Sequence, residues 1–72
     1  MSARDKLIRL RAARKLTQAT VAKELGMSLP TYIKREANPG LFTQEEIEAL
    51  KEILSVEYED IFLPSSPTNS RI

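Results

Sequence analysis

The chain has 72 residues, the size of one small domain, and contains no cysteine and no histidine. Disulfide bonds and thiolate metal sites are therefore excluded, and the commonest general base and metal ligand is missing, so the composition argues against an enzyme, a metal site or another cofactor. With 11 basic and 10 acidic residues, the formal net charge is only +1.

The N-terminal stretch is charged and amphipathic, and it predicts a first helix from about Arg4 to Arg14. Leu7 and Leu10 lie at helical spacing and give this helix a narrow apolar edge. The sequence contains no segment that resembles a signal peptide and no apolar run long enough to span a bilayer. We therefore expect a cytoplasmic protein that does not contact a membrane.

Thr17 predicts the start of a second helix near Gln18, because its hydroxyl can accept a hydrogen bond from a free backbone N–H in the first turn. The apolar side of this helix consists of Val21, Ala22 and Leu25. Gly26 predicts its end, since glycine adopts the left-handed conformation after a helix without steric cost.

A third helix is predicted from Leu29 to Ala37, with Ser28 as its N-cap. Pro30 is compatible with this helix because the backbone N–H groups of the first turn have no partner within the helix. The expected core contacts of this region are Met27, Tyr32 and Ile33. The sequence Asn38-Pro39-Gly40 then predicts a break.

Thr43 and Glu46 have the spacing of a capping box and predict the start of a fourth helix. Its apolar side consists of Ile47, Leu50, Ile53 and Leu54. A short fifth helix is predicted over Tyr58–Phe62, with Ile61 and Phe62 closing the core. The expected organisation is one domain over residues 1–62 and a flexible C-terminal tail over residues 63–72, which is rich in Pro and Ser.

Charge is divided unevenly between the predicted helices. Residues 1–40 contain nine Lys or Arg against three Asp or Glu, a net charge of +6. Residues 41–62 contain one Lys against seven Asp or Glu, a net charge of −6. This pattern indicates either a basic surface for a polyanion or two solvated helix faces of opposite sign. The acidic residues of the fourth helix are interpreted as a solvated face rather than a catalytic or metal-binding cluster.

The second and third helices, joined by Gly26-Met27-Ser28, have the pattern of a helix-turn-helix. In such a motif the second helix can enter the major groove of DNA with its first residues at the base edges. Spacing alone makes this interpretation only moderately specific, because many helical proteins contain similar corners.

Particular residues strengthen the interpretation: Leu16-Thr17-Gln18, Val21-Ala22, Leu25-Gly26-Met27-Ser28, Thr31-Tyr32, Glu36 and Asp60-Ile61-Phe62. Over about residues 5–62 the chain resembles the phage Cro and CI repressor family, also called the Xre-type helix-turn-helix family. Its subtype is similar to small Cro-like regulators, or modulators of repression, from temperate phages of Gram-positive bacteria. The resemblance implies an all-α, compact five-helix, lambda-repressor-like DNA-binding domain in the cytoplasm of a bacterial host cell.

The resemblance also implies a function, namely a transcriptional regulator of the lysis/lysogeny switch that binds double-stranded operator DNA through helix 29–37. It places six residues at the DNA: Gln18, Ser28, Leu29, Pro30, Thr31 and Lys34. Gln18 would contact a phosphate and brace the third helix, and the hydroxyls of Ser28 and Thr31 would reach phosphate or base. Arg11 and Glu36 occupy the positions of an ion pair between helices. Family members often act as dimers, so a homodimer is a further expectation.

The tip of the third helix departs from the usual chemistry of base recognition, which relies on Arg, Lys, Gln or Asn. Leu29 and Pro30 offer only apolar contacts, Lys34 is the one long donor on that face, and Arg35 is expected to turn partly away. The connection over residues 37–42 also lacks basic residues. A second function therefore stays open, that of an antirepressor that binds the cognate CI repressor protein.

In the antirepressor alternative, the partner-binding residues would be Leu29, Pro30 and Ile33. The acidic fourth helix would then attract the basic DNA-binding surface of the repressor.

Overall fold

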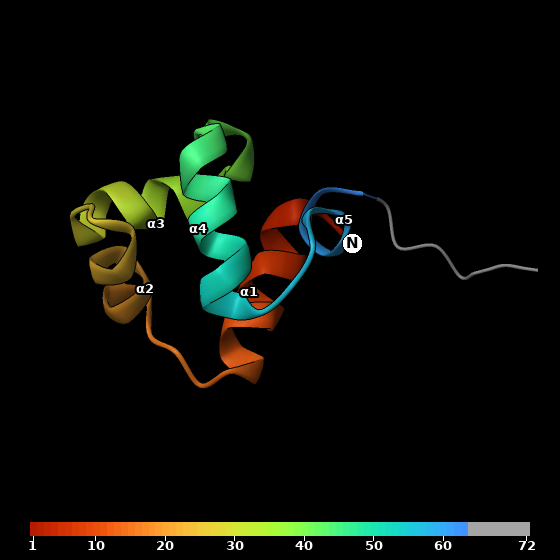
Figure 1. Ribbon diagram of the computed structural model, residues 1–72, viewed down its shortest axis with the longest axis horizontal. Helices are drawn as coiled ribbons and strands as arrows, with labels where there is room; N and C mark the ends of the chain where they lie inside the picture. Colours follow the sequence, from red (N-terminus) through yellow and green to blue (C-terminus); the bar gives the residue numbers. More distant parts are fainter. Residues whose placement is uncertain (64–72) are drawn as a thin grey trace, which may run out of the picture.

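The computed structural model describes residues 1–63 and builds them from helices alone (Figure 1). The elements are α1 (Ala3–Ala13), α2 (Gln18–Leu25), α3 (Leu29–Ala37), the 3-10 turn η1 (Pro39–Leu41), α4 (Gln44–Leu54) and α5 (Tyr58–Phe62). This part of the chain contains no strand, which confirms the prediction of an all-α, five-helix fold. Apart from Leu63, the tail predicted over residues 63–72 lies outside the described residues.

Local hydrogen bonds explain where the helices begin. Thr17, Ser28 and Thr43 are the N-caps of α2, α3 and α4, and each side chain accepts from the backbone N–H three residues further on. The first helix begins one residue earlier than predicted, at Ala3, because Ser2 is also an N-cap and accepts from the N–H of Asp5. It also ends one residue earlier, at Ala13.

The turn between α2 and α3 depends on Gly26, whose φ is 72°. In this left-handed conformation the chain reverses, and the N–H of Met27 donates to the carbonyl of Ala22 over 3.0 Å. Two other residues, Lys15 and Ser55, also have positive φ and end or follow helices without the help of glycine. The turn places the start of α3 beside the end of α2.

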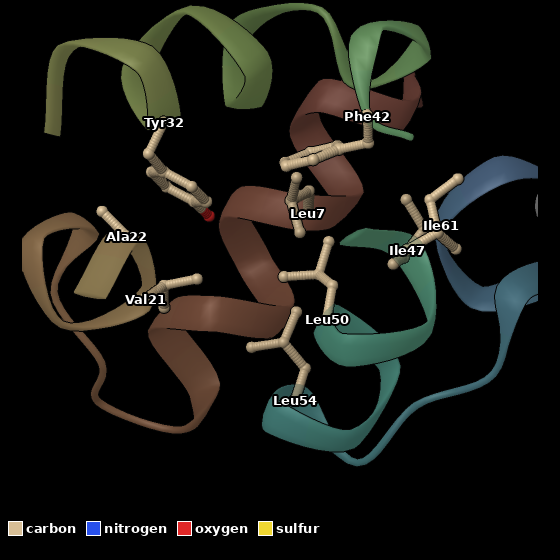
Figure 2. Packing of buried hydrophobic residues seen from close by; sticks show 9 residues of the cluster. All are labelled: Leu7, Val21, Ala22, Tyr32, Phe42, Ile47, Leu50, Leu54 and Ile61. Carbon is tan, nitrogen blue, oxygen red and sulfur yellow. The ribbon is translucent and has the colours of Figure 1, made fainter. Parts of the chain in front are cut away.

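A single apolar core joins all the helices. Its fully or almost fully buried members are Leu7, Val21, Ala22, Tyr32, Phe42, Ile47, Leu50, Leu54 and Ile61. Figure 2 shows these side chains pointing into the space between the helices. α1 packs against α5, and α2 packs against both α3 and α4. Burial of this apolar surface is the main term that stabilises helices too short to persist alone.

One core prediction is wrong, and another holds only in part. Ile33 was expected beside Tyr32 in the core, but its side chain is 44% exposed. Tyr32 and Glu36, four residues apart, occupy the buried side of α3, and Ile33 is rotated by about 100° from Tyr32 around a helix of 3.6 residues per turn. Met27 is only partly buried. Phe42, which follows η1, is buried in the core, and its ring centroid lies 6.2 Å from that of Tyr32.

The two ends of the described chain meet at α1 and α5 (Figure 1). Lys6 is buried there, and its ammonium donates a hydrogen bond to the carbonyl of Leu63. Over residues 1–63 none of the helices has the length and hydrophobicity needed to cross a membrane.

Candidate nucleic-acid interface

α2 and α3 lie together at one end of the molecule, and α4 packs against α2 (Figure 1). Their mutual arrangement is set by the turn at Gly26 and by a hydrogen-bonded cluster at the C-terminal end of α3. The cluster consists of Arg11 from α1, Gln18 from α2, and Tyr32 and Glu36 from α3. Three helices are therefore joined at one buried carboxylate.

The carboxylate of Glu36 accepts hydrogen bonds at both oxygens. Oε2 accepts from Arg11 Nε at 2.7 Å and from Tyr32 Oη at 2.8 Å. Oε1 accepts from Gln18 Nε2 at 2.7 Å and, at 3.4 Å, from Arg11 Nη2. Arg11 also donates to the carbonyl of Leu16 over 2.8 Å, which fixes the loop before α2. A buried charge is costly unless it is paired and hydrogen-bonded, and here it is both.

The ionisation of the cluster follows from these contacts. Burial alone raises the pKa of Glu36, but hydrogen bonds from Arg11, Gln18 and Tyr32 outweigh it and hold this pKa below its ordinary value. The hydrogen bond to Glu36 raises the pKa of Arg11, and burial together with that carboxylate raises the pKa of the Tyr32 phenol. At neutral pH the cluster is therefore a carboxylate, a guanidinium and a neutral phenol.

The predicted DNA-contacting residues of α3 lie on its outer side. Leu29 is 40% exposed, and Ser28, Pro30 and Lys34 are also exposed, whereas Thr31 is half-buried. The hydroxyl of Ser28 accepts from the N–H of Thr31 at 3.3 Å and donates to Thr31 Oγ1 at 2.9 Å. The hydroxyl proton of Ser28 is therefore used in a hydrogen bond within the cap, whereas the hydroxyl of Thr31 can donate to an external acceptor.

Gln18 lies apart from these residues. Its side chain is half-buried and turned toward Glu36, so it braces α3 from behind. One N–H of the amide is used by Glu36, and the second, together with the free backbone N–H groups at the start of α2, remains suited to an anion. Arg11 and Glu36 meet in the ion pair described above.

A groove of about 370 Å³ lies between α3 and η1 and is lined by Pro30, Thr31, Lys34, Arg35 and Leu41. Arg35 borders this groove and is turned toward α4. Its guanidinium forms an ion pair with Glu46 at the start of α4. No local pattern in the sequence predicts this pair, because its members lie in different helices and are separated by 11 residues.

The acidic side chains of α4 and α5 do not form a second candidate binding site within residues 1–63. Over residues 1–63 no group of three acidic side chains is arranged to hold a metal ion. The carboxylates of α4 serve instead as helix caps and surface partners, with Glu46 in the capping box and Glu48 near Lys51. The outer side of α3 is thus the best-defined candidate site.

Comparisons with known proteins point to this same motif. Residues 7–61 match the helix-turn-helix family. The chain is also 33% identical over 61 residues to the cryptic phage CTXphi transcriptional repressor RstR of Vibrio cholerae serotype O1. The aligned part is 85% of this chain and 54% of that protein, so the chain spans about half the length of the relative. No solved structure matches the chain.

These matches agree with the Cro and CI resemblance seen in the sequence, but a relative from Vibrio cholerae gives no support to an origin in a phage of Gram-positive bacteria. The matched residues 7–61 include the cluster around Glu36, the turn at Gly26 and the whole of α3. The chain belongs to the helix-turn-helix family.

Proposed function

We propose that the chain is a DNA-binding transcriptional regulator of the Cro and CI type, which binds operator DNA with α3 in the major groove and acts in a phage lysis/lysogeny switch. The observation that carries the proposal is the rigid presentation of α3. Its outer side is exposed, while its inner side is fixed to α1 and α2 through Glu36. A match to a phage transcriptional repressor supports the same function.

Each exposed side chain of α3 is chemically suited to a particular feature of DNA. Lys34 is the long donor of the exposed face and would reach a guanine edge or a phosphate. Leu29 and Pro30 suit the methyl group of thymine, which is the apolar feature of the major groove. Gln18 and the start of α2 would hold a phosphate, because free N–H groups at a helix N-terminus attract anions. Such contacts favour a thymine-containing half-site.

The test uses DNA selected from a random pool with the purified chain, followed by fluorescence anisotropy on the selected duplex. Lys34→Ala should weaken binding by about 1–3 kcal/mol. The matched control is Lys51→Ala, which removes the same charge from α4, on the acidic part of the chain, and should change the affinity little. Affinity should also fall steeply as salt is raised, because bound phosphates release counterions.

Two results would contradict the proposal. One is a failure to bind any duplex even at low salt. The other is an equal loss of affinity in Lys34→Ala and Lys51→Ala, which would mean that DNA binding depends only on the net charge of the chain.

A homodimer on two half-sites is part of the proposal, since helix-turn-helix proteins often read half-sites about one helical turn apart. Sedimentation velocity with the selected duplex tests it, and one chain per duplex at saturation would exclude it. The alternative of an antirepressor acting on a CI repressor through Leu29, Pro30 and Ile33 gains no support from the comparisons, which favour a regulator that itself binds DNA.

A further inference from the structure

The groove between α3 and η1 contains cationic side chains that could bind an anion, and a carboxylate of the protein already contacts one of them. Two of its five lining residues, Lys34 and Arg35, are cationic, Thr31 adds a hydroxyl, and Pro30 and Leu41 form apolar walls. The carboxylate of Glu46 already contacts the Arg35 guanidinium. The groove lies along the same outer side of α3 that carries Lys34.

Glu46 has a second role that does not depend on Arg35. Its Oε1 accepts from the N–H of Thr43 at 2.9 Å, and its own N–H donates to Thr43 Oγ1 at 3.1 Å. The hydrogen bond from the Thr43 backbone is the main cause of the lowered pKa of Glu46, with Arg35 adding to it, so the carboxylate is ionised at neutral pH. Release of Arg35 would therefore leave the capping box, and the start of α4, intact.

We propose that a backbone phosphate of bound DNA enters this groove and takes Arg35 from Glu46, so that Glu46 sets both the affinity for DNA and its salt dependence. This inference rests on the proposed function. Arg35 would supply the phosphate contact that the uncharged α3–α4 connection, residues 37–42, lacks. Glu46 acts as an internal competitor for a phosphate, and it weakens DNA binding without touching a base.

The exchange of partners is physically accessible. The side chains of Arg35 and Glu46 are 26% and 22% exposed, and ion pairs in contact with solvent add little to stability. A guanidinium also binds phosphate oxygens in a two-pronged geometry that a flexible ammonium cannot match. The carboxylate and an incoming phosphate repel each other, so Glu46 opposes phosphate entry even after Arg35 has moved.

The experiment measures binding of the full chain to a labelled duplex of mixed sequence by anisotropy, over a series of salt concentrations. The variant is Glu46→Gln, whose amide oxygen can still accept from the Thr43 N–H. The matched control is Glu45→Gln, an exposed residue in the same helical turn that loses the same charge. Arg35→Ala is made in the wild-type and in the Glu46→Gln background, and circular dichroism verifies that each variant is folded.

We expect Glu46→Gln to bind about fivefold more tightly and to steepen the slope of log K against log salt by about 1, while Glu45→Gln changes affinity less than about twofold. Arg35→Ala should cost clearly more affinity in the Glu46→Gln background than in the wild type, because in that background Arg35 binds phosphate without first breaking its ion pair with Glu46.

Equal gains in Glu46→Gln and Glu45→Gln, or equal costs of Arg35→Ala in both backgrounds, would overturn the inference and leave the proposed function standing. A wild-type chain that binds no duplex at low salt would instead overturn the proposed function, and this inference with it.

Discussion

At the level of single residues, the buried carboxylate of Glu36 holds α3 against two other helices, while the opposite side of α3 stays exposed. It receives donors from α1, α2 and α3, and α3 is the helix whose opposite side is exposed. A rigid helix positions contacts on DNA more accurately than a mobile one, because less conformational freedom is lost on binding. In the proposed function the cluster would support DNA recognition by holding α3 in place, and of its four members only Gln18 would itself contact DNA.

The hydroxyl of Tyr32 provides a clean test of this cluster. Tyr32→Phe removes one hydrogen bond of 2.8 Å to a buried carboxylate and keeps the ring that packs in the core. The free energy of unfolding should fall by about 1.5–3 kcal/mol, the usual contribution of a hydrogen bond to a charged group. Tyr58→Phe, at an exposed ring on α5, is the control for urea denaturation. Equal stability of the two variants would show that the Tyr32 hydroxyl contributes nothing.

At the scale of elements, the ends of the helices depend on contacts within about four residues along the chain. Thr17, Ser28 and Thr43 cap the helices that they precede, and Gly26 ends α2. The bounds of α2, α3 and α5 could therefore be predicted from the sequence. The first helix was placed one residue late because the hydroxyl of Ser2 was not recognised as a cap.

The turn between α2 and α3 requires glycine at position 26, and this requirement can be tested. No atom lies within 4 Å of a Cβ added at Gly26, so the cost of Gly26→Ala comes from its φ of +72° alone. The left-handed conformation costs a residue with a side chain about 1–2 kcal/mol, and thermal unfolding should reveal a loss of this size. Gly40→Ala is the matched control, since a Cβ there meets only the Asn38 side chain at an ordinary 3.6 Å. A turn that tolerated both substitutions equally would not depend on glycine.

At the scale of the whole molecule, the stability of the fold should depend on pH through its paired carboxylates. Glu36 and Glu46 have lowered pKa values in the folded chain, so the unfolded chain binds protons more readily. Their contribution is complete above the unfolded pKa of about 4.3 and is lost as pH falls through the folded values. With no histidine in the sequence, we expect a flat urea midpoint between about pH 5 and 8 and a decline below.

Urea titrations at single pH steps check this profile. A midpoint that stays constant to pH 3 would mean that the two carboxylates contribute no net stability. A decline that already begins near pH 7 would place the responsible group elsewhere.

Local patterns in the sequence were enough to predict the number of helices, most of their ends and the helix-turn-helix, because caps, glycine and apolar spacing act over a few neighbouring residues. Contacts between helices are set by their packing. The family resemblance implied that Gln18 braces α3. The hydrogen bond from Tyr32 to Glu36, the outward direction of Ile33 and the Arg35–Glu46 pair are seen only in the folded chain. These contacts depend on how the helices pack around one core, and a single sequence carries no local signal for that packing.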